Sequence, residues 1–349
     1  MPDHTRVYVP RSLSKGRLDK HLAQGWYRIG QTLMTCRFLV FEEQLRSTIW
    51  TRLDLREHSF RKGQRKHLRR IRREFRVRVQ PATVDAARER IYQAYRVQAR
   101  GDRTTTAADV LMLSGSLDLF DTWEVSLWRG DELVAFSWFD LGRKSLQSIM
   151  GAYPPEESKW GLGYATMLLE MEWGQEHGFH YHYTGYVMPG EPAMDYKLRA
   201  GEMQWLTQDG AWRPWETFDP AAAPLAAIDD ALTDVLTVLE DASVPARKRD
   251  YLLFEASTYD RSLASCYDEP RVVEVFPLHH AVSALFVAWD LDAAEYRVTR
   301  VRRASGVMRP PDPARRPRQV ELFMREEDLG HSSSAAGVLA ILRSRLGME

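Results

Sequence analysis

The stretch from residue 160 to residue 199 constrains this chain most, because it places a helix start, a helix end, a strand and a polar loop in close succession. Gly161 and Gly163 flank the start of a helix with apolar residues at helical spacing, and Gly178 stands where helices commonly end. The aromatic run HYHYTGY then predicts a strand. A short loop follows with three polar residues, Asp195, Tyr196 and Lys197. This order is typical of a transferase core.

The preceding residues predict one helix and three antiparallel strands. Apolar residues recur at helical spacing from Thr83 to Val97. Two aromatic and apolar runs, 123–128 and 133–138, enclose the turn sequence WRGDE and predict a hairpin, and residues 144–151 predict a third strand. Helix, three antiparallel strands, glycine turn, helix and strand is the element order of the GNAT acyltransferase fold. We therefore expect an α+β, GNAT-like architecture.

The glycine turn before the helix is a candidate anion site. Backbone N–H groups at a helix start point outward, and the helix dipole favours a negative charge there. Glycine lets such a backbone approach a phosphate closely. We expect the phosphate of a donor to bind at four residues, Gly161, Leu162, Gly163 and Tyr164. A plain tight turn is the alternative interpretation.

The loop after the strand supplies candidate catalytic groups. Acyl transfer to an amine requires an oriented carbonyl, a stabilised oxyanion and a neutral attacking amine. Tyr196 could donate a hydrogen bond to the oxyanion, and Asp195 could orient the amine. Lys197 could bind a phosphate or a ribose, or could be a solvated surface lysine.

The aromatic strand predicts which side chains face together. Alternation places one set on one face, His180, His182, Thr184 and Tyr186. The other face carries Tyr181, Tyr183 and Gly185. The tyrosines either pack in the core or line a substrate cleft, and Tyr186 completes our set of candidate catalytic residues. No metal is expected, because a third-ligand spacing is missing around the histidines His177, His180 and His182.

The formal net charge of zero hides a polarised chain. Between Arg56 and Arg78 there are eleven Arg or Lys residues against Glu57 and Glu74, whereas residues 220–241 are acidic. Leu68 and Ile71 give the basic run a thin apolar seam, so a short helix is expected. A solvated helix face is one interpretation, but so many like charges favour a nucleic-acid partner. The candidate contacts are Arg65, Lys66, Arg69, Arg70 and Arg73.

The remaining sequence indicates the cellular compartment and the domain boundaries that we expect. Cys36 and Cys266 form neither a disulfide framework nor a metal-ligand spacing, and the chain has no signal-peptide core or apolar run of about 18 residues, so we expect a cytoplasmic protein without a membrane span. The segment TLMTCRFLVF predicts a buried strand. The tail predicts helices at 225–240 and 335–346, strands at 272–276 and 284–289, and a linker at 309–318. We expect an N-terminal basic subdomain at 1–78, a transferase domain at 79–215 and a C-terminal domain at 216–349.

Three blocks of the chain resemble the aminoacyl-tRNA–protein transferases of the N-degron pathway, the arginyl-transferases and their bacterial leucyl-transferase relatives. GWYRIGQTLM is similar to the family's Gly-Trp-Arg-Arg-Ser-Gly segment at Gly25, Trp26, Arg28 and Gly30, and the basic run is similar to the family's arginine-rich stretch. The third block matches a tyrosine-rich pattern at Leu162, Gly163, Glu172, Gly178, Tyr181, Tyr183, Gly185, Tyr186, Met194, Tyr196, Lys197 and Arg199. The resemblance covers about residues 20–213.

The resemblance implies transfer of an amino acid from the 3′ end of a charged tRNA to an amino group, without a cofactor. Arg28 joins the expected tRNA contacts, and the turn at 161–164 would hold the tRNA 3′ end. Departures leave the donor amino acid and the acceptor open: the family's cysteine cluster is missing after Cys36, its Phe-Phe-Asp-Pro segment appears as residues 150–154, and EPAMDY replaces its Cys-x-Lys-Met segment. The acceptor is a protein N-terminus, a peptide or a small molecule.

Two other functions remain open. An acyl-CoA-dependent N-acyltransferase would use the same fold but would leave the basic run unexplained. A catalytically silent tRNA-binding protein would keep the basic run without turnover.

Overall fold

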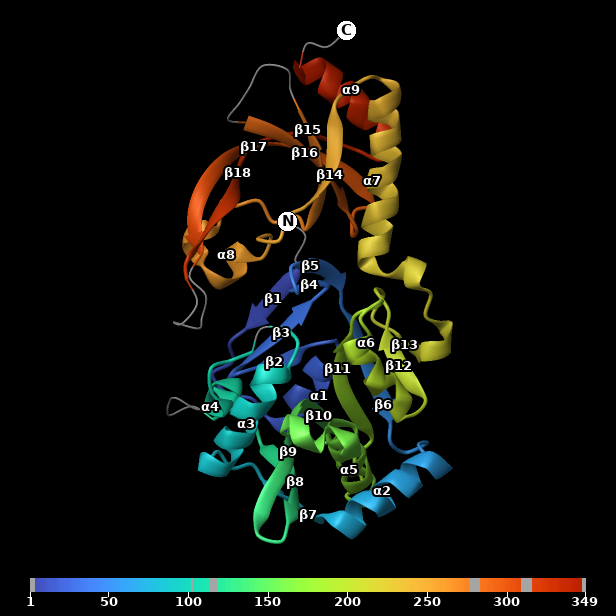
Figure 1. The fold of residues 1–349 in the computed structure, drawn as a ribbon. Helices are drawn as coiled ribbons and strands as arrows, with labels where there is room; N and C mark the ends of the chain where they lie inside the picture. The colour runs from blue at the N-terminus through green and yellow to red at the C-terminus, as the bar shows by residue number, and fades with distance from the viewer. Residues whose placement is uncertain (1–3, 102, 113–117, 277–282, 309–315, 347–349) are drawn as a thin grey trace. The chain divides into compact units, whose positions relative to one another are not determined.

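The computed structural model describes residues 4–101, 103–112, 118–276, 283–308 and 316–346, which divide into two compact units. Unit 1 contains residues 1–6, 36–47 and 219–349, and unit 2 contains residues 7–35 and 48–218. The chain therefore passes between the units four times. Both units combine helices with β-sheets, which agrees with the predicted α+β class (Figure 1).

Unit 2 is built on a mixed eight-stranded sheet with the order β13-β12-β6-β11-β10-β9-β8-β7 (Figure 1). Its strands are β6 (Ile49–Asp54), β7 (Arg76–Pro81), β8 (Thr122–Arg129), β9 (Glu132–Leu141), β10 (Ser145–Ala152), β11 (Tyr181–Val187), β12 (Met203–Leu206) and β13 (Trp212–Pro214). The strands β8, β9 and β10 form the predicted antiparallel meander, and β11 returns parallel to β10 through the helix α5 (Leu162–Glu176). This confirms the GNAT-like element order.

Helices cover both faces of this sheet because the side chains of β9 alternate between two apolar clusters. Phe139 and Leu141 pack with α5, whereas Phe136 and Trp138 pack with the helix α3 (Ala86–Gln98). The helix α2 (Lys62–Glu74) lies against α5 and buries the predicted seam of Leu68. Shorter helices complete the unit: α1 (Lys15–Ala23), α4 (Ala107–Leu111), α6 (Pro192–Asp195), η1 (Pro155–Trp160), η2 (Tyr196–Ala200) and η3 (Trp215–Thr217).

The segment 27–36 forms part of a small three-stranded sheet with the order β1-β3-β2. These strands are β1 (Thr5–Tyr8), β2 (Tyr27–Ile29) and β3 (Thr32–Cys36). The predicted single strand in TLMTCRFLVF is wrong. Strand β3 ends at Cys36, and a second strand, β4 (Phe38–Phe41), begins after Arg37 and pairs with β5 (Gln44–Ser47).

Unit 1 is a five-stranded antiparallel sheet with two long helices packed on it. The sheet order follows the chain, through β14 (Ala246–Asp250), β15 (Arg271–Val275), β16 (Ser283–Asp290), β17 (Glu295–Met308) and β18 (Arg318–Ser332). The helices are α7 (Pro224–Asp241) and α9 (Ala335–Leu346), and shorter turns are η4 (Pro220–Ala222), α8 (Ala256–Tyr259) and η5 (Arg261–Leu263). Phe38 and Leu45 of the β4–β5 hairpin join its core.

Two predictions about organisation need correction. The expected separate subdomain at 1–78 does not exist, because β6 lies inside the eight-stranded sheet between β11 and β12. The end of unit 2 at Phe218 lies close to the predicted boundary at 215, but unit 1 also recruits residues 36–47. The long hairpin of β17 and β18 was not predicted, and most of the expected linker at 309–318 lies outside the described residues.

Candidate active site

The candidate site lies where β10 and β11 separate. The two strands pair only from Ser145 opposite Tyr181 to Gln147 opposite Tyr183. Beyond that point Tyr27 reaches between them, and its hydroxyl donates a hydrogen bond to the Ile149 carbonyl at 3.1 Å. Burial, and then the neighbouring Tyr186 hydroxyl, raise the pKa of Tyr27, so this phenol stays protonated and remains a donor.

A bulge in β11 opens room beside Tyr27. The pairing of β11 with β6 shifts register between Tyr183 and Gly185, so the alternation predicted along this strand is interrupted at Thr184. Gly185 has a φ of +84°, which favours glycine. A Cβ added there would lie 3.5 Å from the Tyr27 ring and 3.8 Å from Lys197 Nζ. Both distances are ordinary van der Waals contacts, so the positive φ, and not a lack of space for a Cβ, favours glycine here, and Tyr27 and Lys197 both lie close to this piece of backbone.

Lys197 is the candidate catalytic residue whose pKa is shifted closest to neutral pH. It lies in η2, and its Nζ donates a hydrogen bond to the Tyr186 carbonyl at 2.9 Å. The same Nζ lies 5.5 Å from the centre of the Tyr186 ring. Burial and then the positive charge of Arg103 lower the pKa of Lys197 to about 8. A lysine that titrates near neutral pH beside an open stretch of strand is a functional-site candidate.

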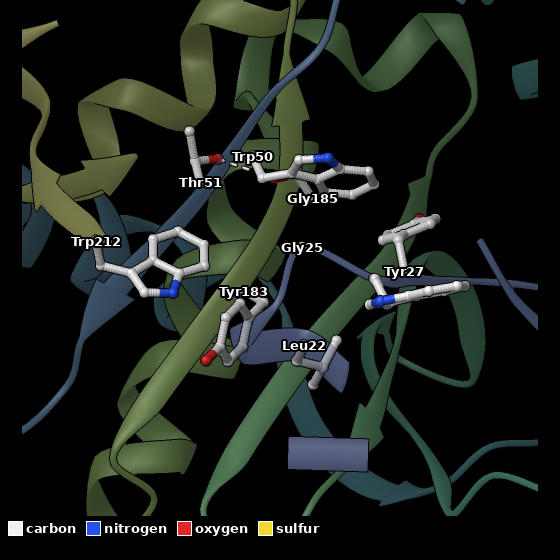
Figure 2. A pocket seen from close by; sticks show the side chains of 9 residues that line it. Leu22, Gly25, Tyr27, Trp50, Thr51, Tyr183, Gly185 and Trp212 are labelled. Atoms are coloured by element: carbon white, nitrogen blue, oxygen red, sulfur yellow. Dashed lines mark hydrogen bonds between the residues drawn. The ribbon is translucent and has the colours of Figure 1, made fainter. Parts of the chain in front are cut away.

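An aromatic pocket adjoins this group (Figure 2). It is a small, partly open hollow with a cavity volume of about 10 Å³, lined by Leu22, Gly25, Trp26, Tyr27, Trp50, Thr51, Tyr183, Gly185 and Trp212. Tyr27, Trp50 and Tyr186 contact one another, with ring centres 5.5 to 6.5 Å apart. The lining has no charged side chain, so the pocket suits an uncharged group.

The structure separates the other predicted catalytic residues. Tyr196 is half-buried, and burial followed by the nearby Tyr95 and Glu170 raises its pKa, so it too remains a hydrogen-bond donor. Asp195 is exposed at the end of α6. Tyr186, Tyr196 and Lys197 thus surround the strand gap, whereas Asp195 faces solvent.

The predicted anion turn forms the start of α5. Gly161 is the residue before the helix and has a φ of +60°, and the first intrahelical bond runs from the Ala165 amide to the Gly161 carbonyl. The amides of residues 162–164 consequently have no acceptor within the helix. Leu162 is buried completely, backbone included, so it cannot contact a ligand as predicted, whereas Gly161, Gly163 and Tyr164 are partly exposed. The Tyr164 hydroxyl donates to the Arg199 carbonyl at 2.9 Å.

Gln64 links the basic helix α2 to the start of α5 and to η2, the segment that carries Lys197. Its side-chain amide donates to the Tyr164 hydroxyl at 3.0 Å and to the Ala200 carbonyl at 2.7 Å. The predicted tRNA contacts on α2 are all exposed: Arg65, Lys66, Arg69, Arg70 and Arg73. Arg70 also stacks on Trp160, 4.3 Å from the ring centre. The structure thus presents a cationic helix face attached to the loop that carries Lys197.

Arg28 does not belong to this face. Only 1% of it is exposed, and Nη1 of its guanidinium lies 2.8 Å from Asp140 Oδ1. Further hydrogen bonds reach the Gly30 and Leu111 carbonyls. We therefore withdraw Arg28 as a tRNA contact and assign it to the structure of the fold, because its charge is already satisfied inside the protein.

The strand histidine at the centre of the sheet is structural as well. His182 Nε2 lies 3.1 Å from Glu170 Oε2, and Ser137 Oγ donates to Glu170 Oε1 at 2.6 Å. All three side chains are buried, so they tie α5 to β9 and β11. Within the described ranges, no group of three or more His, Cys, Asp or Glu side chains is arranged to hold a metal ion.

The sequence predicted some of the pocket residues: Tyr183 was expected to line a cleft or to pack in the core, and it lines the pocket. Tyr27, Trp50 and Trp212 were not predicted as site residues. Tyr27 lies inside the Gly25–Gly30 block, Trp50 comes from β6 more than 100 residues before the third block, and Trp212 comes from β13, 13 residues after Arg199. No local pattern predicts that these residues meet.

Comparison with known proteins agrees with this geometry over part of the chain. Residues 87–207 match the family model described as the C terminus of arginine-tRNA-protein transferase. Similar curated proteins are an aspartate/glutamate leucyltransferase of Acinetobacter baumannii, 30% identical over 30% of this chain and 42% of its own length, and one of Xylella fastidiosa, 32% identical over 27% and 37%. This segment is thus similar to aminoacyl-tRNA transferases, and the chain spans less than half the length of the relatives it matches.

Solved structures with some likeness share little sequence. They include a tandem GNAT protein from the clavulanic acid biosynthesis pathway, with a TM-score of 0.31, 12% identity and coverage of 58% of this chain and 61% of that one. Another is L-PGS from Bacillus licheniformis, with a TM-score of 0.33, 14% identity and coverage of 52% of each chain. At such TM-scores these likenesses add nothing to the fold derived from the strand order. Among the described helices, none is long and apolar enough to cross a bilayer.

Proposed function

We propose that the protein transfers an amino acid from a charged tRNA to the amino group of an acceptor. The observation that carries this proposal is the attachment of the exposed cationic face of α2 to the loop bearing Lys197, through Gln64. The cationic face of α2 suits a nucleic-acid donor, and a lysine near the strand gap suits acyl transfer. The similarity of residues 87–207 to aminoacyl-tRNA transferases supports the same function.

The reaction needs no cofactor in this proposal. The acceptor nitrogen forms a bond to the carbonyl carbon of the aminoacyl ester, the carbon–oxygen bond to the ribose breaks, and the amine proton passes to the leaving ribose oxygen. Charged Lys197, beside the strand gap, stabilises the oxyanion of the tetrahedral intermediate. The Tyr196 phenol remains protonated and orients the ester as a hydrogen-bond donor, whereas the Tyr27 hydroxyl donates its hydrogen bond to the Ile149 carbonyl.

The pocket selects the donor amino acid. Aromatic and aliphatic side chains from Leu22, Trp50 and Trp212 line it, and none of the lining residues carries a charge. A cationic donor side chain would lie there without a carboxylate partner, at a cost of several kcal/mol, and the one cation near Gly185, Lys197, is assigned to the oxyanion in this proposal. We therefore expect an uncharged, apolar amino acid as the donor, bound with its ester near Gly185.

The tRNA body binds to α2, and the partly exposed backbone of Gly163 and Tyr164 contacts a phosphate of the donor. Lys66, Arg69 and Arg73 point to solvent, and no carboxylate in the described ranges pairs with any of the three. Such charges release counterions when they meet a phosphate backbone. The donor therefore binds with a strong dependence on salt.

A transfer assay tests the proposal. The full chain is incubated with a pool of tRNAs charged with labelled amino acids, together with peptides of differing N-termini, and the products are identified by mass spectrometry. We expect the label of an apolar amino acid to leave the tRNA and appear on an amine. Specific, saturable turnover of acetyl-CoA without tRNA would replace the proposal by the acyl-CoA alternative. Tight tRNA binding without transfer from any donor would favour the silent tRNA-binding protein.

A further inference from the structure

A second group of exposed positive side chains surrounds the helix α1, apart from those of α2. Arg17 and Lys20 are exposed on α1, and Arg143 and Lys144 are exposed in the turn between β9 and β10. Within the described ranges, no carboxylate pairs with any of these four side chains. Together with one further lysine of α1 they form what we call the α1 surface: Lys15, Arg17, Lys20, Arg143 and Lys144.

Hydrogen bonds hold the turn against the helix. The Lys144 amide donates to Asp19 Oδ2 at 3.1 Å, and the Arg143 amide donates to the Lys15 carbonyl at 3.3 Å. A Cβ added at Gly142 would lie 2.0 Å from Asp19 Oδ1, so a side chain at this position would push Asp19 away from the turn. The cations of the turn and of the helix are thus held together as one surface.

The charges of the α1 surface are not balanced. Its five cations have two carboxylates beside them, Asp121 at 2.5 Å from Lys15 Nζ and Asp19 against the turn, which leaves three positive charges. Lys15 and Arg17 lie in the first turn of α1, where the helix dipole opposes a positive charge and no acidic residue is present. Arg17 and Lys20 are three residues apart, a spacing at which like charges repel on a helix. An anionic partner would relieve this repulsion.

The α1 surface lies at the end of the sheet from which α2 begins. Leu55, which follows β6 and precedes α2, donates its amide to the His180 carbonyl at 2.8 Å, and the His180 amide donates to the Lys144 carbonyl at 2.8 Å. The helix α1 packs on the face of the sheet that carries Tyr183, whereas α2 packs against α5 on the other face. A nucleic acid that crosses this end of the sheet would therefore meet both surfaces.

We propose that the α1 surface binds the phosphate backbone of the donor tRNA at a second place, separate from the contact on α2. This inference rests on the proposed function, because it concerns the donor of that reaction. The four unpaired side chains of the surface contact phosphates and read no bases, so this contact does not depend on the tRNA sequence. Two separate contacts fix the orientation of a rigid tRNA on unit 2, which one helix does not.

The test measures how salt affects the binding of deacylated tRNA to the full chain, by filter binding. The variant replaces the four unpaired side chains and leaves the backbone hydrogen bonds of the turn intact: Arg17→Gln, Lys20→Gln, Arg143→Gln and Lys144→Gln. Each lost phosphate contact lowers the slope of log affinity against log salt by about 0.7–0.9, so we expect a decrease of about 3. Arg90→Gln is the matched control, because Arg90 is exposed on α3 and pairs with no carboxylate in the described ranges. It should leave the slope unchanged.

Hydroxyl-radical footprinting of the bound tRNA separates the two contacts. We expect two protected stretches of backbone, one lost in the fourfold variant and the other in Arg69→Glu with Arg73→Glu. If the fourfold variant does not unfold in urea as the wild type does, the pair Arg143→Gln with Lys144→Gln, which leaves α1 untouched, should still lower the slope by about 1.5.

Three results would overturn the proposal or the function on which it rests. An unchanged slope and footprint in a folded variant would overturn the contact on the α1 surface. Unchanged tRNA binding together with weaker binding of an acidic acceptor peptide would also overturn it, and would assign the surface to the acceptor. Failure of the proposed function looks different, because the wild type would then transfer no amino acid from any charged tRNA, whatever the footprint.

Discussion

Replacing Lys197 by methionine tests the buried cation at the candidate site in a way that does not need the substrate. Burial and the charge of Arg103 hold the pKa of this lysine at about 8, against 10.5 for a lysine in water. Between these two values the unfolded chain binds a proton that the folded chain has lost, so the stability of the wild type rises with pH across that window. Below about pH 8 both states are protonated, and the folded protein carries the full cost of the buried charge.

The magnitude follows from the two pKa values. Each unit corresponds to about 1.4 kcal/mol, so the wild type gains roughly 2 kcal/mol relative to Lys197→Met between pH 7 and pH 9.5. The absolute difference at pH 7 also contains the lost hydrogen bond to the Tyr186 carbonyl, worth about 1–3 kcal/mol. The pH-dependent part of the difference in stability does not contain that contribution, because methionine cannot make this hydrogen bond at any pH.

Urea unfolding followed by tryptophan fluorescence measures this difference. Ten of the eleven tryptophans lie in unit 2, so the signal reports on the unit that contains Lys197. If the unfolding free energies of the wild type and Lys197→Met differ by an amount that stays constant within about 0.5 kcal/mol from pH 7 to pH 9.5, the lowered pKa of Lys197 is refuted. In the transfer assay we expect the wild-type rate to fall above about pH 8, whereas Lys197→Arg, which stays charged, should not show this decline.

Three further predictions concern other parts of the chain. Arg69→Glu with Arg73→Glu should weaken tRNA binding at low salt and reduce the slope of log affinity against log salt by about 2, as measured by filter binding, whereas Arg343→Glu on α9 should not. Arg28→Met should destabilise unit 2 by about 3–5 kcal/mol in urea unfolding, because it leaves Asp140 buried without its partner; replacing Asp140 by Leu as well should recover part of the loss. Leu232→Ala in the core of unit 1 should cost about 2–5 kcal/mol, seen as a lower calorimetric transition temperature of that unit, and an unchanged transition would contradict the burial of Leu232.

Local patterns in the sequence predicted much of unit 2. The seam of Leu68 and Ile71 predicts both the helix α2 and the outward direction of its arginines, since three- and four-residue spacing fixes one buried face. The meander of β8 to β10 and the helix α5 follow from strand alternation, a hairpin turn and a C-terminal glycine. In each case the information lies within about 20 residues.

Contacts between distant segments account for what the sequence did not reveal. Arg28 has the same chemistry as the arginines of α2, but its partner Asp140 lies 112 residues away, and no spacing rule connects them. The pocket depends likewise on the pairing of β6 with β11 and on the bulge at Gly185, which tertiary packing selects. The catalytic prediction for Asp195 rested on its place in the loop, which does not determine the direction of its side chain.

The ribosome makes the hairpin of β4 and β5 long before it makes the residues that cover the apolar face of this hairpin. Phe38 and Leu45 are buried against residues of α7 and the unit 1 sheet, which begin after residue 219. About 170 residues of synthesis separate the hairpin from that partner, and at 5–20 residues per second the delay is roughly 10–35 s. During this time the hairpin presents its apolar face without its native cover, although unit 2 can already fold. The growing chain is therefore a candidate client for chaperones at this hairpin, and a chain cut after Phe218 would keep that exposed face permanently.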